Sequence, residues 1–456
     1  MECVVMRRVA LVCLGLLLSA PAFGQNQNNQ NNNVGGIQIT PQGIVGPGFV
    51  ADQSSRLDRK RQRAFAEKSL AADLAAASAC RKVSLVKLEA AIDGALSQGQ
   101  PLPEEMRHLA GLQRIDFLFV DPEGKDLVIA GPAEGYAPDA SGRMRGAETG
   151  RPTLLLDDLL VALRFVPRAS EVGCSIDPAP GRLAALNQYL AQNSTPASAA
   201  VIEGRYRQMA QVLGMQDVRI MGVPETSRFG HTLLAADYRM KRISLGLENP
   251  GVKGLRSHLA MLTGGGNSLQ RWWFVPYYEG LFRTPDHLAY EFTGQRVQLL
   301  SQEEIATSQG SRFDAATTRQ STQAFAKQFT ERYAELAEQS PVFAELQNLF
   351  DLCLVAALID REQLSSRIDW TMSLLLDEAR LPHGAGPAPR QVPSLSSFKR
   401  ANAGTIIGLV GGGVTIRASQ WVSPQAFRED ASRRIESTRT ESLAAPRVEA
   451  HPWWWD

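Results

Sequence analysis

Strand-like and helix-like patterns alternate along residues 113–303, and this alternation constrains the fold more than any other feature. The β-rich run 115–120 and the apolar run 127–130 flank an Asp-Pro-Glu-Gly turn, which predicts a hairpin. Apolar residues recur at helical spacing over 155–165 and 229–247, which predicts two helices that each bury one face. This mixture is typical of an α/β or α+β fold, in which a mixed sheet has flanking helices.

The length of 456 residues exceeds that of one ordinary domain and gives room for two or three. With 44% hydrophobic and 21% charged residues, the composition is that of a globular chain. Changes in residue type divide the chain into a signal peptide (1–24), a disordered tether rich in Asn, Gln and Gly (25–54), N-terminal helices (55–112), an α/β core domain (113–303), a helical region (313–380), a Pro/Gly linker with a β-hairpin (381–422) and a polar tail ending in a tryptophan triplet (423–456).

The first residues have the order of a secretion signal. Arg7 and Arg8 precede an apolar run over 9–18, and the small residues Ala22 and Gly24 then fit a cleavage site. The apolar run is too short to cross a bilayer, and no later segment holds about 18 uninterrupted apolar residues. We therefore expect an exported protein, periplasmic or extracellular, with no membrane span.

The balance of charges argues against a polyanionic partner. The chain has 48 Lys and Arg against 47 Asp and Glu, and the signal segment contains Arg7, Arg8 and Glu2. The remainder therefore has 48 − 2 = 46 basic and 47 − 1 = 46 acidic residues. A neutral chain lacks the electrostatic attraction on which binding to nucleic acid depends, so no nucleic acid partner is expected.

Helical patterns dominate after residue 313. One apolar stripe consists of Thr322, Phe325, Phe329, Tyr333 and Leu336. The pair Ser340-Pro341 predicts the start of a helix that continues to Ile359, and a last helix is predicted over 363–379.

The sequence then predicts a hairpin whose turn is the glycine triplet 411–413. The triplet 453–455 near the end of the sequence is Trp-Trp-Trp. It has two interpretations, an apolar anchor for a partner or a segment that docks on its own domain.

Three cysteines remain after the signal: Cys80, Cys174 and Cys353. They fit either three buried thiols or one Cys80–Cys174 disulfide, which an extracytoplasmic location would allow. The sequence contains no Cys-x-x-C, no P-loop, no Gly-x-Ser-x-Gly and no His-Glu-x-x-His motif. We therefore predict neither a metal site nor a cofactor.

The helix predicted over 229–247 contains the weak catalytic candidates His231 and Asp237, together with Arg239 and Lys241 as candidate ligand-binding residues. An imidazole near a carboxylate can transfer protons at neutral pH. Residues six apart on a helix do not face each other, however, so a direct dyad would need a bend. The alternative is a packed helix in which Asp237 pairs with Lys241.

An aromatic strand is predicted over 272–278, with ligand-binding candidates Trp273, Tyr277 and Tyr278. Side chains alternate across a strand, so Trp273 and Tyr277 share one face. That face could stack against a sugar or peptide. The alternative is a strand that is buried on both faces.

Several long strings resemble a known family. They include GCSIDP at 173–178, GVPETSRFGHTLLAADYRMKRISLGLE at 222–248 and RWWFVPYYE at 271–279. Together they resemble the planctomycete domain-of-unknown-function family numbered 1598, a set of exported proteins, over roughly 80–300 and onward to about 422. The resemblance implies an extracytoplasmic location and a shared architecture. It implies no catalytic residues.

The sequence favours a non-catalytic extracytoplasmic binding or structural protein over an enzyme. Expected partners are a cell-envelope protein, a peptide or a carbohydrate. The alternative is an extracytoplasmic hydrolase whose site is assembled from distant residues, among them His231 and Asp237.

Overall fold

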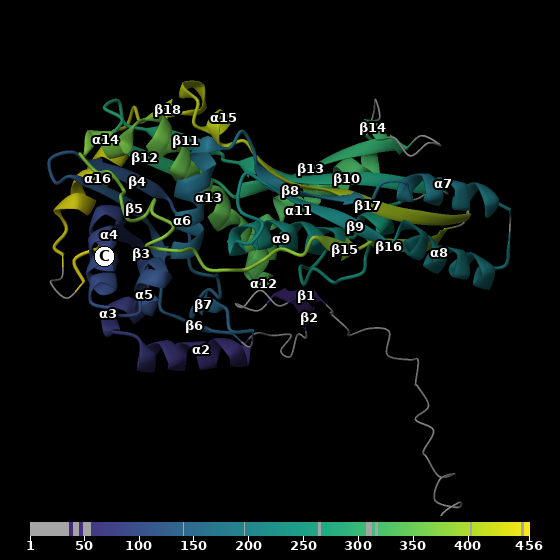
Figure 1. The fold of residues 1–456 in the computed structure, drawn as a ribbon, viewed down its shortest axis with the longest axis horizontal. Helices are drawn as coiled ribbons and strands as arrows, with labels where there is room; N and C mark the ends of the chain where they lie inside the picture. The colour runs from purple at the N-terminus through teal and green to yellow at the C-terminus, as the bar shows by residue number, and fades with distance from the viewer. Residues whose placement is uncertain are drawn as a thin grey trace, which may run out of the picture.

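The computed structural model describes residues 36–39, 45–48, 56–139, 141–195, 197–262, 266–306, 312–314, 318–401, 404–447 and 451–456. Over these residues the chain forms two large mixed sheets that share a core and carry helices (Figure 1). Of the predicted α/β and α+β architectures with a mixed sheet and flanking helices, the structure has the α+β one. The predicted signal peptide lies outside the described residues, as does most of the tether, where only β1 (Gly36–Ile39) and β2 (Val45–Gly48) are described and pair antiparallel.

The first large sheet has seven described strands in the order β18-β11-β12-β4-β5-β3-β19. Their bounds are β18 Arg428–Glu429, β11 Gly280–Arg283, β12 Ala289–Thr293, β4 Phe117–Asp121, β5 Asp126–Ala133, β3 Ser78–Ser84 and β19 Trp454–Trp455. The hairpin predicted across the Asp-Pro-Glu-Gly turn is the pair β4–β5. The strands β4 and β5 are buried on both faces, which explains why they read as continuous apolar runs.

The second large sheet has eight described strands in the order β14-β13-β10-β17-β8-β9-β15, with β16 also paired to β17. Their bounds are β14 Arg312–Asp314, β13 Arg296–Ala306, β10 Gly266–Tyr277, β17 Gly404–Ile416, β8 Val172–Pro178, β9 Met215–Met221, β15 Gln391–Pro393 and β16 Ser396–Ala401. Strand β10 is parallel to β17, whereas the other described pairs of this sheet are antiparallel.

A bent two-stranded ribbon joins the two sheets. Strand β10 pairs with β13 in one sheet, and their continuations β11 and β12 pair with each other in the other sheet. The ribbon bends at residues 278–279 and 294–295, where Gly294 has a positive φ of 93°. A side chain on Gly294 would crowd the backbone nitrogen of Glu279, so the bend requires glycine there.

Helices cover the sheets and carry the rest of the core. Their bounds are α2 Arg56–Ser69, α3 Ala72–Ala75, α4 Leu85–Ser97, α5 Glu104–Arg107, α6 Leu156–Phe165, α7 Arg182–Gln192, α8 Ala199–Leu213, α9 Arg228–Ser244, α10 His258–Met261, α11 Gln320–Glu331, α12 Tyr333–Gln339, α13 Pro341–Arg361, α14 Leu364–Arg367, α15 Ala418–Trp421 and α16 Arg434–Ala444. Strands β6 (Tyr136–Pro138) and β7 (Met144–Gly146) form a separate antiparallel pair.

Helix α13 lies at the centre of the molecule (Figure 1). It begins at Pro341 as predicted, and it contacts α6, α9, α12 and strand β13. By length and composition it is the one helix of the described residues that could cross a membrane, yet its apolar window is wholly buried inside the protein. The predicted stripe Thr322–Leu336 on α11 and α12 is buried against this centre, with the ring of Phe329 5.5 Å from that of Phe343.

Three predictions about local structure were wrong. Strand β3 lies within the stretch predicted as N-terminal helices, because its residues pair with β5 and β19. The helix predicted over 363–379 is only the single turn α14. The segment after α14 turns at Asp369 and Met372, both with positive φ, and the carboxylate of Glu89 accepts hydrogen bonds from the backbone N–H groups of Leu374 and Leu375.

The glycine triplet 411–413 is not a turn either. It lies inside the long strand β17, and the antiparallel partner that makes a hairpin with β17 is β16. A Cβ atom on Gly412 would overlap the carbonyl oxygen of Trp272, and one on Gly413 would overlap that of Cys174. The glycines therefore allow β17 to lie close between β10 and β8.

The polar tail after residue 423 forms β18, α16 and β19. The side chains of Trp453, Trp454 and Trp455 are 2%, 1% and 1% exposed. Of the two interpretations of this triplet, the structure has the one in which it docks on its own domain.

The three cysteines are free thiols, so the Cys80–Cys174 disulfide is absent from the described structure. Cys174 and Cys353 are buried, and Cys80 is partly buried. Burial raises the pKa of all three thiols, which keeps them protonated at neutral pH.

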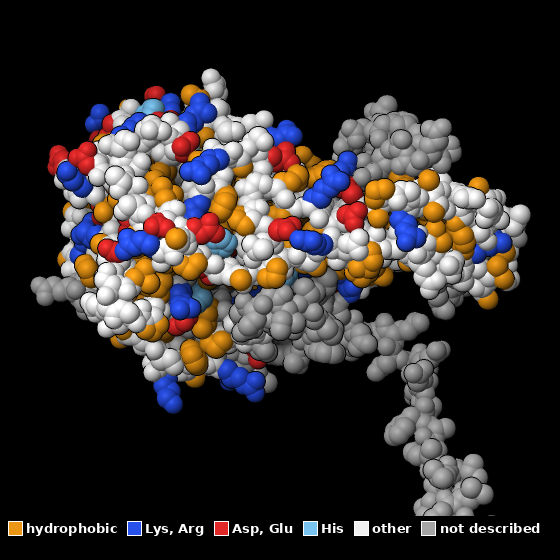
Figure 2. Space-filling view, in the orientation of Figure 1, with side chains coloured by type: hydrophobic (Ala, Val, Ile, Leu, Met, Phe, Trp, Pro, Cys, Tyr) orange, Lys and Arg blue, Asp and Glu red, His pale blue; other side chains and the backbone are white. Residues whose placement is uncertain are grey.

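Helices α7 and α8 form an arm at one end of the molecule with a small core of their own (Figure 1). Figure 2 shows hydrophobic side chains along this arm. Val201 of α8 is 49% exposed. Elsewhere on the face in Figure 2, basic and acidic side chains are interspersed, as the balanced net charge predicts.

Candidate functional site

A cavity of about 300 Å³ lies where α5, the residues before α6, the start of α9 and helix α13 meet. Its polar lining includes His108, Thr153, Arg228, His231 and Glu345. Apolar side chains such as Met144, Leu155 and Ala235 complete the wall. The volume lies at the lower end of the range for small-molecule sites, and the mixture of apolar wall and few polar groups is typical of them.

Arg228 forms ion pairs with two acidic residues at the charged side of the cavity. Its two terminal nitrogens lie 2.6 Å from Asp158 Oδ2 and 2.6 Å from Glu345 Oε1. The hydroxyl of Ser227 caps helix α9 by accepting a hydrogen bond from the N–H of Gly230, which places Arg228 in the first turn. Burial raises the pKa of Asp158 to about 6, although the charge of Arg228 opposes this.

A second arginine approaches the same acid. Arg143 Nη1 lies 3.4 Å from Glu345 Oε2, so both oxygens of Glu345 face a guanidinium group. Glu345 comes from the apolar helix α13 and is 5% exposed. A buried carboxylate in an apolar helix needs such partners, because an unpaired buried charge is strongly destabilising.

His231 lies one turn after Arg228 on α9 and is 2% exposed. Burial, with the charges of Arg143 and Arg228, lowers its pKa to about 4, and a backbone hydrogen bond with Gly386 opposes the shift. The imidazole is therefore neutral at neutral pH. Among the described residues its Nδ1 atom has no hydrogen-bond partner.

In a neutral imidazole one ring nitrogen donates and the other accepts, so a free Nδ1 can form a hydrogen bond with a polar ligand in either tautomer.

His108 forms a chain of contacts across the other side of the cavity. Its Nδ1 lies 2.8 Å from Thr153 Oγ1, and its Nε2 lies 3.3 Å from Glu104 Oε2. Burial, followed by the charges of Arg228 and Arg107, lowers the pKa of His108 to about 4. The order hydroxyl, imidazole, carboxylate is the one that activates hydroxyl nucleophiles, but an imidazole with so low a pKa is a weak base.

The structure separates the two candidates His231 and Asp237. Asp237 is fully buried and its Oδ2 lies 2.7 Å from Lys241 Nζ, which also donates to the carbonyl oxygen of Gly412. Burial raises the pKa of Asp237 to about 6. The pair belongs to the packing of α9 against β17, so the alternative of a packed helix with an Asp237–Lys241 pair describes this helix.

Lys241, a ligand-binding candidate, is 1% exposed and its Nζ is paired with Asp237, and its ligand-binding role stays a prediction. Arg239 also forms an ion pair, in which its Nε lies 2.7 Å from Glu248 Oε1. Helix α9 presents His231 and Arg228 to the cavity at its first turns and packs against the sheet further on.

The aromatic strand β10 has one buried and one partly exposed face. Trp272 and Phe274 are fully buried, whereas Tyr277 is 37% exposed and Trp273 is partly exposed beneath the guanidinium of Arg271. The stacking surface of Trp273 and Tyr277 stays a prediction. Tyr278 does not belong to it, because its side chain is buried and its hydroxyl donates to Asp351 Oδ1.

Sequence reasoning missed His108, Thr153, Arg228 and Glu345. The available signal was Glu345, one of the few charged residues inside a largely apolar helical run. It indicates a buried ion pair but does not identify the partner.

The described residues contain no group of three or more His, Cys, Asp or Glu side chains that could hold a metal ion. Fold and cavity define an α+β protein with a cavity of mixed polar and apolar lining. The model of the family described as "Protein of unknown function (DUF1598)" matches residues 174–258, which run from β8 to α10 and include Arg228 and His231. The resemblance is thereby supported over this stretch. None of the curated proteins and none of the solved structures compared with the chain matches it.

Proposed function

We propose that this chain is an exported, non-catalytic protein that binds a small polar molecule in the cavity between α5, α6, α9 and α13. The observation that carries the proposal is the buried, unpartnered Nδ1 of His231 in the wall of a 300 Å³ cavity. A buried polar atom without a partner costs free energy, and a ligand with a hydrogen-bonding group would recover it.

The surrounding groups restrict the ligand further. Arg228 and Arg143 are held by Glu345 and Asp158, so the cavity is close to neutral. Met144, Leu155 and Ala235 offer apolar contact. These features favour an uncharged or zwitterionic molecule with a hydroxyl or amino group, such as a sugar or a short peptide fragment of the cell envelope.

The binding test is the unfolding midpoint of the protein against cell-wall sugars, short peptides and nucleotides. A ligand at about a hundred times its Kd adds roughly 2.7 kcal/mol, which raises the midpoint by about 2 to 4 °C in a chain of this size. Ala235→Leu should abolish the shift, since it fills the cavity and leaves the ion pairs intact. Ala90→Leu on the exposed face of α4 is the matched control. A shift that survives Ala235→Leu would place the ligand elsewhere.

Export has a separate test, which rests on the signal pattern in residues 1–24. Expression of the full chain in a bacterium should yield a processed protein outside the cytoplasm whose first residue is Gln25. A cytoplasmic protein that keeps its first 24 residues would contradict export and leave the binding proposal intact.

A second candidate function, hydrolysis, is favoured by the contact between His108 and Thr153. In that case an organophosphorus probe would label the protein at Thr153, and labelling would disappear in Thr153→Val and in His108→Gln. Labelling that persists in both variants, or that never occurs, would count against hydrolysis. The low pKa of His108 favours binding over hydrolysis.

A further inference from the structure

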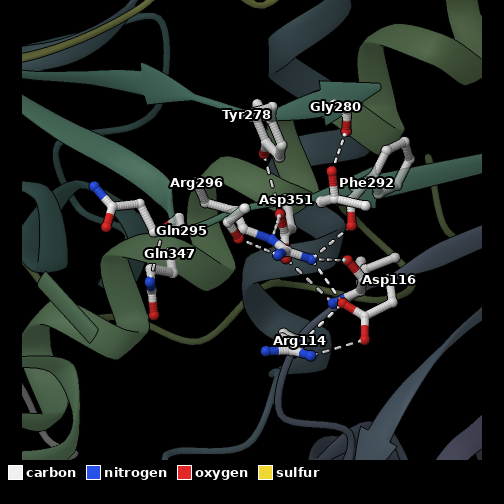
Figure 3. Close-up of polar contacts among 12 residues, drawn as sticks. Arg114, Asp116, Tyr278, Gly280, Phe292, Gln295, Arg296, Gln347 and Asp351 are labelled. Atoms are coloured by element: carbon white, nitrogen blue, oxygen red, sulfur yellow. Dashed lines mark hydrogen bonds and ion pairs between the residues drawn. The ribbon is translucent and has the colours of Figure 1, made fainter. Parts of the chain in front are cut away.

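A second cavity, of about 340 Å³, lies where the ribbon bends from one sheet to the other. Its wall includes Arg114, Arg151, Arg296, Gln347 and Asp351. Figure 3 shows how the labelled members of this group converge from β13, α13 and the segment before β4. No described residue lines both this cavity and the histidine-lined one, so an inference about it goes beyond the proposed function.

Two of the three arginines form ion pairs with aspartates. Arg296 Nε lies 3.3 Å from Asp351 Oδ1, and one of its terminal nitrogens lies 2.6 Å from Asp116 Oδ1 (Figure 3). Arg114 contacts both oxygens of Asp116, at 2.9 and 3.1 Å. Asp351 also accepts from the hydroxyl of Tyr278 and from the N–H of Ile115. The positive charges of Arg114 and Arg296 are therefore balanced by the negative charges of Asp116 and Asp351.

Arg151 is the third arginine, and no described carboxylate pairs with it. Its Nη2 donates to Gln347 Oε1 at 2.7 Å, and the amide of Gln347 is oriented by donating to the carbonyl of Gln295. The Nε of Arg151 is buried and has no partner among the described residues. Burial, with the charges of Arg114 and Arg296, lowers the pKa of Arg151, while Asp351 and Glu338 oppose the shift.

The geometry points to a site in which Arg151 and Arg114 bind a small oxyanion, either a carboxylate or a phosphate-like group. A guanidinium group presents its N–H donors in a planar fork that matches such oxygens two at a time. An anion would supply the missing acceptor for Arg151 Nε and offset the repulsion among three arginines. Glu279 also lines the cavity, but it is exposed and its charge is screened by solvent.

The test is a calorimetric titration of the protein with sodium phosphate, sulfate and acetate at constant ionic strength in chloride. We expect saturable binding of at least one of them. Acetate alone would identify a carboxylate site, and phosphate or sulfate a site for a tetrahedral oxyanion. Arg151→Gln should weaken binding by about tenfold or more, because it removes charge-assisted hydrogen bonds. The control Arg390→Gln changes an arginine whose side chain is 87% exposed and should leave binding unchanged.

Saturation distinguishes a site from general salt effects, since sulfate and phosphate stabilise proteins without a site in proportion to their concentration. Arg151→Lys keeps the charge but loses the fork, so it should bind more weakly than the wild type and serves if Arg151→Gln does not fold. No saturable binding of any of the three anions would overturn the proposal. Equal affinity in the wild type and in the Arg151 variants would overturn it as well.

Discussion

The guanidinium of Arg81 and the carboxylate of Asp456 form two hydrogen bonds, of 2.8 and 2.9 Å, between residues 375 positions apart. Arg81 lies on β3 and also donates to four backbone carbonyl groups, while its guanidinium covers the ring of Trp454 at 4.6 Å. This contact explains why the tryptophan triplet docks on the first sheet: β19 pairs with β3, and Arg81 fixes the residue that follows it.

Replacement of Arg81 by methionine should therefore lower the free energy of unfolding by about 3 kcal/mol or more, because four carbonyl groups and one carboxylate lose their donor. Denaturant titration measures the loss. Arg390→Met, at an exposed side chain, is the matched control and should change stability by less than about 0.5 kcal/mol. An Arg81→Met variant as stable as the control would contradict this account of the tail.

Alanine at Gly412 should destabilise the protein by about 3 kcal/mol or more, since the new methyl group would overlap the backbone of Trp272 and φ is 112°. The control is Gly204→Ala in α8, where nothing lies within 4 Å of the added atom. That variant should be stabilised by roughly 0.5 to 1 kcal/mol through helix propensity. Unfolding midpoints compare the two, and a neutral Gly412→Ala would refute the close packing of β17 against β10.

Elements with one strong local pattern could be predicted from the sequence. The sequence predicts the apolar stripe of α9 and the stripe from Thr322 to Leu336, because the helical spacing of the apolar residues marks the buried face of each helix. The turn predicted at the glycine triplet 411–413 was wrong. Local propensity favours a turn there, but β17 lies between β10 and β8, and glycine allows these three strands to approach closely. The helix predicted over 363–379 was wrong because the carboxylate of Glu89, far away in the sequence, accepts hydrogen bonds from backbone N–H groups of this segment.

The candidate site was harder to predict than the fold. His231 was found from its residue type, but its neighbours His108, Thr153 and Glu345 come from other elements of the chain. These side chains come together only when α5, α9 and α13 pack against one another. The spacing of residues in the sequence does not indicate this packing. Arg151 was missed for a related reason, since an arginine in a loop is unremarkable until two others are placed beside it.

The Asp237–Lys241 pair offers a third prediction. Asp237→Asn should destabilise by about 3 to 5 kcal/mol, because it leaves the buried Lys241 charge without its partner. The double variant Asp237→Leu with Lys241→Met removes both charges and should recover most of that loss. Denaturant titrations of the wild type, the single and the double variant test the prediction. A double variant that is less stable than Asp237→Asn would contradict the prediction. It would show that the ion pair stabilises the protein more than apolar side chains at the two positions do.

The last prediction concerns pH and His231. The pKa of His231 is about 4 in the folded protein against an ordinary 6.5, so the unfolded chain binds its proton more readily. The stability due to the neutral ring is complete above pH 6.5 and is lost as the pH falls towards 4. Asp158 and Asp237, whose pKa values burial raises to about 6, act in the opposite direction, so the comparison must be made between variants rather than on the wild type alone.

His231→Asn removes the titrating ring, so its destabilisation relative to the wild type should be larger at pH 7.5 than at pH 4, by up to about 3 kcal/mol. Thr232→Val changes a neighbour in the same cavity without changing a titrating group, and its effect should be the same at both pH values. Denaturant titrations at the two pH values measure both differences. If the effect of His231→Asn were independent of pH, the ring would not be held neutral, which would contradict the neutral imidazole on which ligand binding is proposed to depend.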